Sequence, residues 1–225
     1  MPGRVEEPHP APPRIRQLKL GVLHPINPDQ FLDDDAELEG VELEGLVVDE
    51  LVWTGRRRLD ASSATGLMVG DWTARGCGFT ESVLERTQVR TLSARGSGWR
   101  AMQVRNSRLG FAELCDSELR AVHFENCKIG YLNLRDAHLS DVCFVDCILE
   151  DVDLIRATAL RIAFPGSRIT RLDVTSAKLK DFDLRGAQLS GLEGLAGLRG
   201  ATISADQLFD LAPVFAQQLG LTVAP

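Results

Sequence analysis

Residues 119–154 read LRAVHFENCKIGYLNLRDAHLSDVCFVDCILEDVDL and place an apolar residue at every fifth position. The same step continues from Leu59 to Leu189 with an apolar residue at each position. The residues two places earlier, from Ser62 to Ala187, carry no charge. We name the apolar position i and the uncharged one i−2. The pattern indicates a five-residue repeat with two inward-facing positions.

Neither a helix nor a straight strand accommodates this spacing. Five residues advance a helical face by about 140°, so the apolar set would spread around the whole cylinder. On a straight strand an odd step would reverse the apolar side at every repeat. The chain must therefore bend once every five residues, which keeps i and i−2 on the inside.

Two longer periods fix the number of bends in one coil. The i−2 residues alternate between large and small, as in Leu132, Ala137, Val142 and Cys147. At a period of twenty, like residues recur, as in the column Phe124, Phe144 and Phe164. Small residues on two opposite walls let large ones from the other walls fill the interior. We predict an all-β solenoid, a right-handed quadrilateral β-helix of about eight coils with a short C-terminal α-helical cap.

At this point the sequence resembles the pentapeptide-repeat family, whose consensus is A-(D/N)-L-x-x. The resemblance covers residues 36–203 and implies the quadrilateral β-helix. Some bacterial members are gyrase-interacting quinolone-resistance proteins that end in a helical cap, dimerise through it into DNA-sized rods and protect DNA gyrase. The segments that echo the consensus are Ala137-His138-Leu139, Asp153-Leu154, Asp173-Val174, Asp183-Leu184 and Ala187-Gln188-Leu189.

The repeat also predicts the domain boundaries. We expect a disordered proline-rich tail over 1–14, an N-terminal cap over 15–35, the β-helix over 36–203 and a C-terminal helical cap over 204–225. One residue is inserted near 54–58, where we expect a bulged corner with Arg56, Arg57 and Arg58 in solvent. A capping box at Ser204 opens one helix, and Pro213 suits the first turn of a second.

Composition points to a soluble cytoplasmic protein. The chain has 225 residues, 44 % hydrophobic residues and a net charge of −7. It shows no apolar run of membrane-spanning length and no signal peptide, so we expect no membrane association. Five cysteines is an odd number and favours reduced thiols. Cys127 and Cys147 should stack about 5 Å apart, within disulfide range, although buried thiols fit a reducing compartment better.

The sequence offers no chemistry typical of an enzyme, and we predict no catalytic residues, no cofactor and no metal site. No phosphate loop, zinc motif or nucleophile elbow is present. His123 and His138 should point outward on different faces. Cys143 should point outward and Cys147 inward, so the two cannot share a tetrahedral metal site.

Two sets of charged residues are candidates for a partner-binding surface. The alternative for both sets is that these charges contact only water and keep a rod-shaped protein in solution. A basic belt is expected around one coil at Arg90, Arg95, Arg100 and Arg105. Acidic candidates are Asp141, Asp146, Glu150, Asp151 and Asp153 on about one coil, and Glu39, Glu42 and Glu44 near the N-terminal end.

Two functions remain open. The favoured one is a non-enzymatic protein-binding scaffold with an unknown partner and no direct nucleic acid contact, because residues 59–189 are neutral overall. The alternative is a DNA mimic that binds DNA gyrase or topoisomerase and confers quinolone or toxin resistance, as the family resemblance implies. A homodimer through the C-terminal helices is also expected. Its candidate interface is Leu208, Leu211, Val214, Phe215, Leu219 and Leu221.

Overall fold

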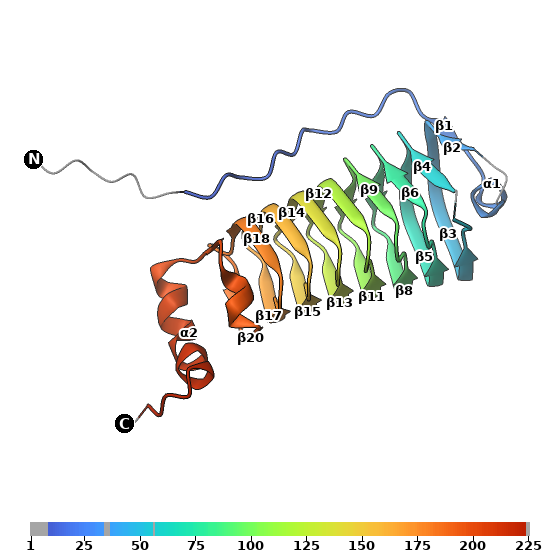
Figure 1. The fold of residues 1–225 in the computed structure, drawn as a ribbon. Helices are drawn as coiled ribbons and strands as arrows, with labels where there is room; N and C mark the ends of the chain where they lie inside the picture. Colours follow the sequence, from blue (N-terminus) through green and yellow to red (C-terminus); the bar gives the residue numbers. More distant parts are fainter. Residues whose placement is uncertain (1–8, 34–36, 56, 224–225) are drawn as a thin grey trace, which may run out of the picture.

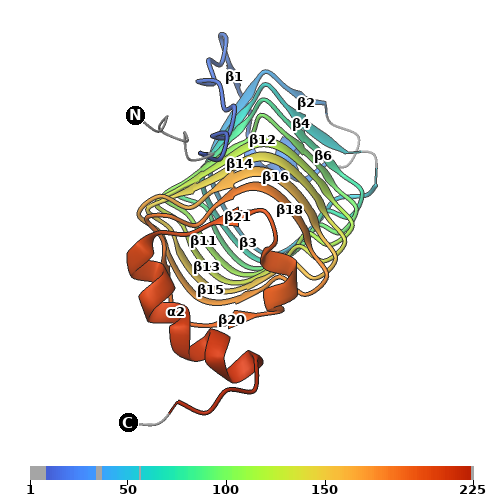
Figure 2. The ribbon, with the colours of Figure 1, turned by 60° about the vertical axis from the view of Figure 1, so that its left-hand side comes forward.

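The computed structural model describes residues 9–33, 37–55 and 57–223. The chain coils into a parallel β-solenoid of about nine turns, with a helix at its C-terminal end (Figure 1). The turns stack around one central interior (Figure 2). The predicted solenoid and its helical cap are therefore confirmed. The turn count exceeds eight because β1 (His24–Pro25) and residues 190–203 add partial turns at the two ends.

The strands form stacked columns joined by parallel pairing. One set contains β2 (Leu38–Glu39), β4 (Arg58–Asp60), β6 (Gly78–Thr80), β9 (Gly98–Arg100), β12 (Glu118–Glu125), β14 (His138–Val145), β16 (Thr158–Ala163) and β18 (Lys178–Asp183). The other contains β3 (Val41–Val52), β5 (Ser63–Thr73), β8 (Gln88–Ser93), β11 (Arg108–Glu113), β13 (Lys128–Asn133), β15 (Ile148–Asp153) and β17 (Arg168–Asp173). The short β7 (Val83–Glu85) and β10 (Gln103–Arg105) lie between β5 and β12, and β19 (Gln188–Leu189), β20 (Leu192–Glu193) and β21 (Ala201–Thr202) close the ladder.

The register confirms the twenty-residue turn and the inserted residue. Leu59 pairs with Phe79, and Phe124 pairs with Phe144. In the first turn Leu38 pairs with Leu59, which is one residue more. The extra residue lies between Trp53 and Leu59, as predicted, so each face stays in line after the insertion.

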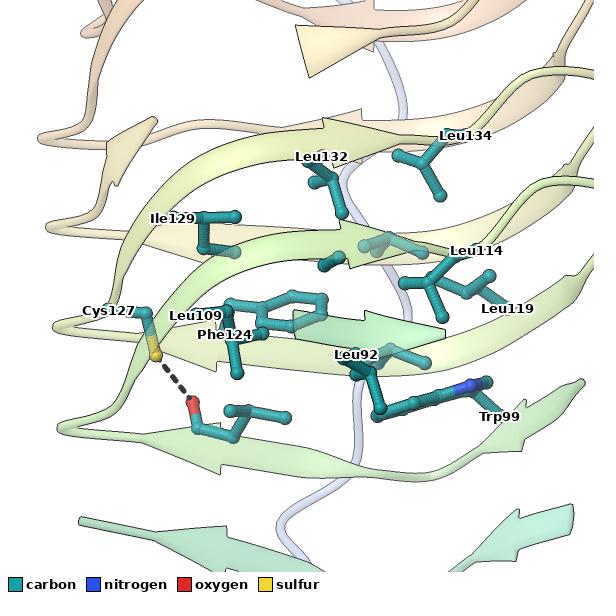
Figure 3. Close-up of a cluster of buried hydrophobic side chains, with 14 of the residues drawn as sticks. Leu92, Trp99, Leu109, Leu114, Leu119, Phe124, Cys127, Ile129, Leu132 and Leu134 are labelled. Atoms are coloured by element: carbon teal, nitrogen blue, oxygen red, sulfur yellow. Dashed lines mark hydrogen bonds between the residues drawn. The ribbon is translucent and has the colours of Figure 1, made fainter. Parts of the chain in front are cut away.

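The interior is filled by the i and i−2 side chains, as Figure 3 shows for the central turns. Phe124, Phe144 and Phe164 stack nearly parallel, with centroids 4.8 and 5.2 Å apart. Small i−2 residues also satisfy backbone groups at the corners. The Ser107 hydroxyl accepts from the Thr87 N–H and donates to the Arg105 carbonyl. The buried corner N–H groups therefore have partners, which explains why serine and cysteine occupy these positions.

At three of the four corners in each turn, the residue two places after i has a left-handed backbone conformation. Ala121, Asn126 and Asp136 have φ of 52–57° and represent these corners. At the fourth corner the strand continues through the bend, for example across β11 and β13. This extended corner carries Phe111 and Tyr131, whose rings stack 5.1 Å apart on the outside. The repeat pattern did not distinguish this corner from the others.

The N-terminal end is closed by α1 (Pro28–Leu32). Its Phe31 is fully buried and packs against Trp53, with ring centroids 5.0 Å apart. Arg57 is buried as well, so the prediction that it lies in solvent is wrong. The insertion puts Arg57 at the i−2 position of Leu59, where its guanidinium donates to the carbonyls of Phe31 and Asp33 and lies over the Trp53 ring. Arg58 is exposed, as expected, and Arg56 lies outside the described residues.

The segment before the cap differs from the prediction. Residues 9–23 run along one side of the solenoid from the C-terminal turns to β1 (Figure 1), and we name them the strap. The Ala11 N–H donates to Asp181 and the Arg14 N–H to Asp141. A disordered tail is therefore wrong for residues 9–14, because corner carboxylates bind their backbone; residues 1–8 lie outside the described residues. Among the described residues of the predicted 15–35 cap, 24–33 reach the end of the solenoid, whereas 15–23 belong to the strap.

The C-terminal end is covered by the 3₁₀ helix η1 (Leu195–Leu198) and by α2 (Ala205–Gln218). Ser204 and Gln207 form the predicted capping box. The Gln207 amide also donates to the Leu184 and Ala187 carbonyls of the last full turn. Pro213 lies inside α2, so the prediction of a second helix that begins there is wrong. The proline removes one backbone hydrogen bond but leaves a single continuous helix.

Candidate interaction surfaces

The acidic residues predicted on one coil are mostly engaged by the solenoid itself. Asp153 is fully buried and accepts from Arg135 Nε at 2.6 Å and from the Tyr131 hydroxyl at 3.1 Å. Asp141 is also buried, and both of its oxygens accept from Arg161 at 2.5 and 2.7 Å. These two residues are not part of an accessible surface, which corrects their assignment as partner-binding residues.

The Asp141 site is the best-enclosed ion pair among the candidates. The hydrogen bond from Arg161 lowers the pKa of Asp141 below its usual value, and the Arg14 N–H of the strap adds to this effect. The side chains of Asp141 and Arg161 are only 11 % and 16 % exposed. The carboxylate therefore stabilises the junction between the strap and the solenoid.

The remaining members of that group are more exposed. Asp151 pairs with Arg171 at 2.8 Å, and Glu150 pairs with Lys128 at 2.8 Å. Asp146 is exposed at a left-handed corner with φ of 52°. Exposed ion pairs of this kind contribute at most about 1 kcal/mol each. Four of the five predicted carboxylates have an ion pair, so Asp146 is the one that the fold engages least.

The acidic residues of the first turn have a different environment. Glu39 in β2 and Glu42 and Glu44 in β3 are exposed, as predicted. Glu39 lies in register with Asp60, while Glu42 and Glu44 lie in register with the uncharged Ser63 and Thr65. Within the described ranges, none of these three glutamates forms an ion pair. We name Glu39, Glu42 and Glu44 the acidic first turn.

The predicted basic belt encircles the solenoid but is partly neutralised. Arg90 pairs with Asp71 at 2.5 Å, Arg95 with Asp116 at 2.7 Å and Arg105 with Glu125 at 3.7 Å. Arg100 is exposed on the face of β9. The belt is therefore not a uniform positive band.

The predicted C-terminal interface divides into a buried and an exposed part. Leu211 is buried against the last turn, and Val214 and Phe215 are half-buried. Leu208 and Leu219 face solvent and do not cover the last turn. Leu221 is exposed, and so is Phe209, which the sequence analysis did not include.

The strap creates a covered face that sequence reasoning missed. A hollow of about 530 Å³ lies between the strap and the face of β10, β12 and β14, and its lining includes His123 and Cys143. Burial lowers the pKa of His123 and raises the pKa of the Cys143 thiol to about 11. Both side chains were predicted to point into solvent, and both are half-covered. Gln103 beneath the strap is buried.

The cysteines and possible metal ligands can be placed directly. Cys127 and Cys147 are buried as free thiols, and the Cys127 thiol donates to the Val104 carbonyl (Figure 3). No cluster of three histidine, cysteine or acidic side chains suited to a metal occurs within the described residues. Across those residues, no helix is long and apolar enough to cross a membrane.

The geometry defines a class, a four-sided β-solenoid of five-residue repeats. Comparison with protein families agrees: residues 117–193 match the model described as pentapeptide repeat region. Residues 117–193 therefore form a pentapeptide-repeat region, as the resemblance of the sequence predicted.

Solved structures of QnrB1, titled a plasmid-mediated fluoroquinolone resistance protein, are also similar. The full-length QnrB1 structure is 14 % identical, covers 78 % of this chain and 99 % of its own, and has a TM-score of 0.38. A trypsin-treated variant is 15 % identical, covers 84 % and 93 %, and has a TM-score of 0.36. No curated protein matches the chain.

Proposed function

We propose that this protein is a non-enzymatic scaffold that binds a protein partner in the cytoplasm. The observation that carries the proposal is the acidic first turn. Glu39, Glu42 and Glu44 project from a rigid parallel ladder, and the next turn presents no base in register with them. Carboxylates held in this way attract a basic partner surface at long range and fix its orientation.

The other acidic candidates, on the coil that contains Asp141 to Asp153, are less available to a partner than the acidic first turn. Asp141, Asp151 and Asp153 already have arginine partners at hydrogen-bond distance. A partner that competed for them would have to break these ion pairs first. The acidic first turn imposes no such cost, so a basic surface gains its full electrostatic attraction there.

Affinity capture with the purified full-length protein tests the proposal. We expect a partner that binds the wild type to be lost with the variant E39K/E42K/E44K and to be retained with D146K/E150K/D151K, which has the same change in net charge. Raising the salt concentration should weaken capture by the wild type. Equal capture by both variants at every salt concentration would contradict a role for the acidic first turn.

A second candidate is DNA mimicry directed at DNA gyrase, and the same acidic turn favours it. A mimic must present carboxylates to a basic DNA-binding surface in place of phosphates. The arginines of the following turns act against this role, so we rank it below the scaffold. A supercoiling assay with purified gyrase and a quinolone tests it: inhibition or protection should disappear in E39K/E42K/E44K. No effect at a large molar excess would exclude mimicry of DNA toward gyrase.

We further propose that the scaffold is a homodimer joined through α2. Leu208 and Phe209 of α2 are 51 % and 77 % exposed, and Leu219 and Leu221 just beyond the helix are 74 % and 61 % exposed. An isologous pairing of two helices would bury this apolar surface. Leu211 is excluded from such an interface because it packs against its own last turn.

A further inference from the structure

A hollow of about 820 Å³ lies on the face formed by β4, β6, β9 and β12. Arg58, Arg100 and Arg120 line it, together with a single acid, Glu118. Its floor includes Gly98, where an added Cβ would meet no atom within 4 Å. The hollow is therefore open above its floor, and its charged lining carries an excess of two positive charges.

The arginines are arranged in a way that the fold alone does not favour. Arg100 and Arg120 are register partners on neighbouring strands, about 4.8 Å apart along the solenoid axis. Like charges directly opposite each other on a sheet are destabilising. Across the floor, Arg58 stands in register with Gly78, which in turn pairs with Gly98. Three guanidinium groups thus surround one glycine-lined space.

Two arginines of the basic belt on the neighbouring faces have carboxylate partners. Arg90 pairs with Asp71 and Arg95 with Asp116. In the part of the chain that the structure describes, Arg58, Arg100 and Arg120 have neither an ion pair nor a side-chain hydrogen bond. A bound anion would supply the missing negative charge at the Arg100–Arg120 pair and satisfy the donors of all three side chains.

The number and geometry of the donors indicate which anion fits. A guanidinium presents a planar fork that matches carboxylate or phosphate oxygens. A carboxylate has two oxygens, whereas a phosphate group has three strong acceptor oxygens and close to two negative charges. The phosphate therefore offers more acceptor oxygens and more charge than a single carboxylate to two adjacent arginines and a third one across the floor. The remaining volume has room for a second phosphate group.

We propose that this hollow binds a compact polyphosphate anion, of the inorganic pyrophosphate or nucleoside diphosphate class. Arg100 and Arg120 hold one phosphate group jointly, and Arg58 contacts the anion from the opposite side. Glu118 closes the far end and repels anions that extend past it. This site goes beyond the scaffold function and does not depend on it.

Isothermal titration of the full-length protein at low ionic strength tests the site. Sodium pyrophosphate and ADP are the probes, and citrate is the carboxylate comparator. We expect at least one phosphate probe to bind, and citrate to bind at least about tenfold more weakly. Tighter binding of ADP would identify a nucleotide ligand, and binding of pyrophosphate alone an inorganic one. Equal binding of citrate, or no heat with either phosphate probe, would overturn the proposal.

Two pairs of variants, each with a matched control, distinguish a loss of binding from a loss of folding. Arg100→Ala should lower the affinity about tenfold to a hundredfold. Lys180→Ala should leave it unchanged, because Lys180 is exposed in the same column as Arg120 but outside the hollow. Gly98→Glu should abolish binding, since its carboxylate would neutralise Arg100 and Arg120 and would lie in register with Glu118, so that both acids repel the anion. The uncharged Gly98→Gln should weaken binding less than Gly98→Glu, and an unchanged affinity in Gly98→Glu would refute the site.

Discussion

The phenylalanine column gives the sharpest test of the inside–outside pattern. Phe144 is 1 % exposed and stacks between Phe124 and Phe164. Phe144→Ala would remove a fully buried ring and two stacking contacts from a close-packed interior. Truncations of this kind cost about 3–5 kcal/mol, and the two aromatic contacts account for roughly 1–3 kcal/mol of that range. We therefore expect the free energy of unfolding to fall by about 4 kcal/mol.

Phe111→Ala is the matched control, because it makes the same substitution in a stacked pair on the outside. Phe111 is 36 % exposed and has one ring partner, Tyr131. Its loss should cost only about 0.5–1.5 kcal/mol. Urea unfolding followed by circular dichroism and by tryptophan fluorescence measures both variants. Equal destabilisation of the two would refute the assignment of inward and outward positions.

Three further predictions concern the charges, the strap and the helix. The lowered pKa of Asp141 means that its carboxylate stabilises the fold above the ordinary aspartate range, and that this contribution is lost as the pH falls through the lowered value. Asp141→Asn should cost about 1–2 kcal/mol at pH 7, and its difference from wild type should vanish in acid unfolding. Deletion of residues 1–17 should speed labelling of Cys143 by a thiol reagent at pH 8, and Cys143→Ser in the deleted chain should remove the fast phase; an unchanged rate would mean that the strap does not cover the thiol. Light scattering should give twice 24.6 kDa for the full chain, and Phe209→Asp should give a monomer, whereas a wild-type monomer would contradict the dimer.

The core was predictable from the sequence because the five-residue period directly encodes which side chains face inward. Phe144 and Cys147 are buried as predicted, and the inserted residue before Leu59 shifts the register by one. The burial of Arg57 follows from the same five-residue pattern, since the insertion moves Arg57 to an i−2 position. The error there was to treat a charge as evidence for solvent exposure.

The ion pairs were not predicted, although the sequence holds a signal for them. Asp136 pairs with Arg156, Asp141 with Arg161 and Asp151 with Arg171. Each arginine follows its aspartate by twenty residues, which is one turn of the solenoid. Opposite charges at this spacing correspond to the i,i+4 pairs of a helix. The strap has no such signal, because its contacts join residues 127 and 170 positions apart through backbone N–H groups.

The same rule separates structural charges from charges that remain available for binding. Where the register places an acid one turn from a base, the fold satisfies both. Glu39 with Asp60 and Arg100 with Arg120 are like charges in register that have no ion pair among the described residues, so the fold bears a repulsion there that an external ion or partner would relieve. These two places lie at the acidic first turn and at the arginine-lined hollow. Because the rigid ladder holds the backbones of these residues one turn apart, the charges stay near each other, and an ion or partner of opposite charge gains binding free energy there.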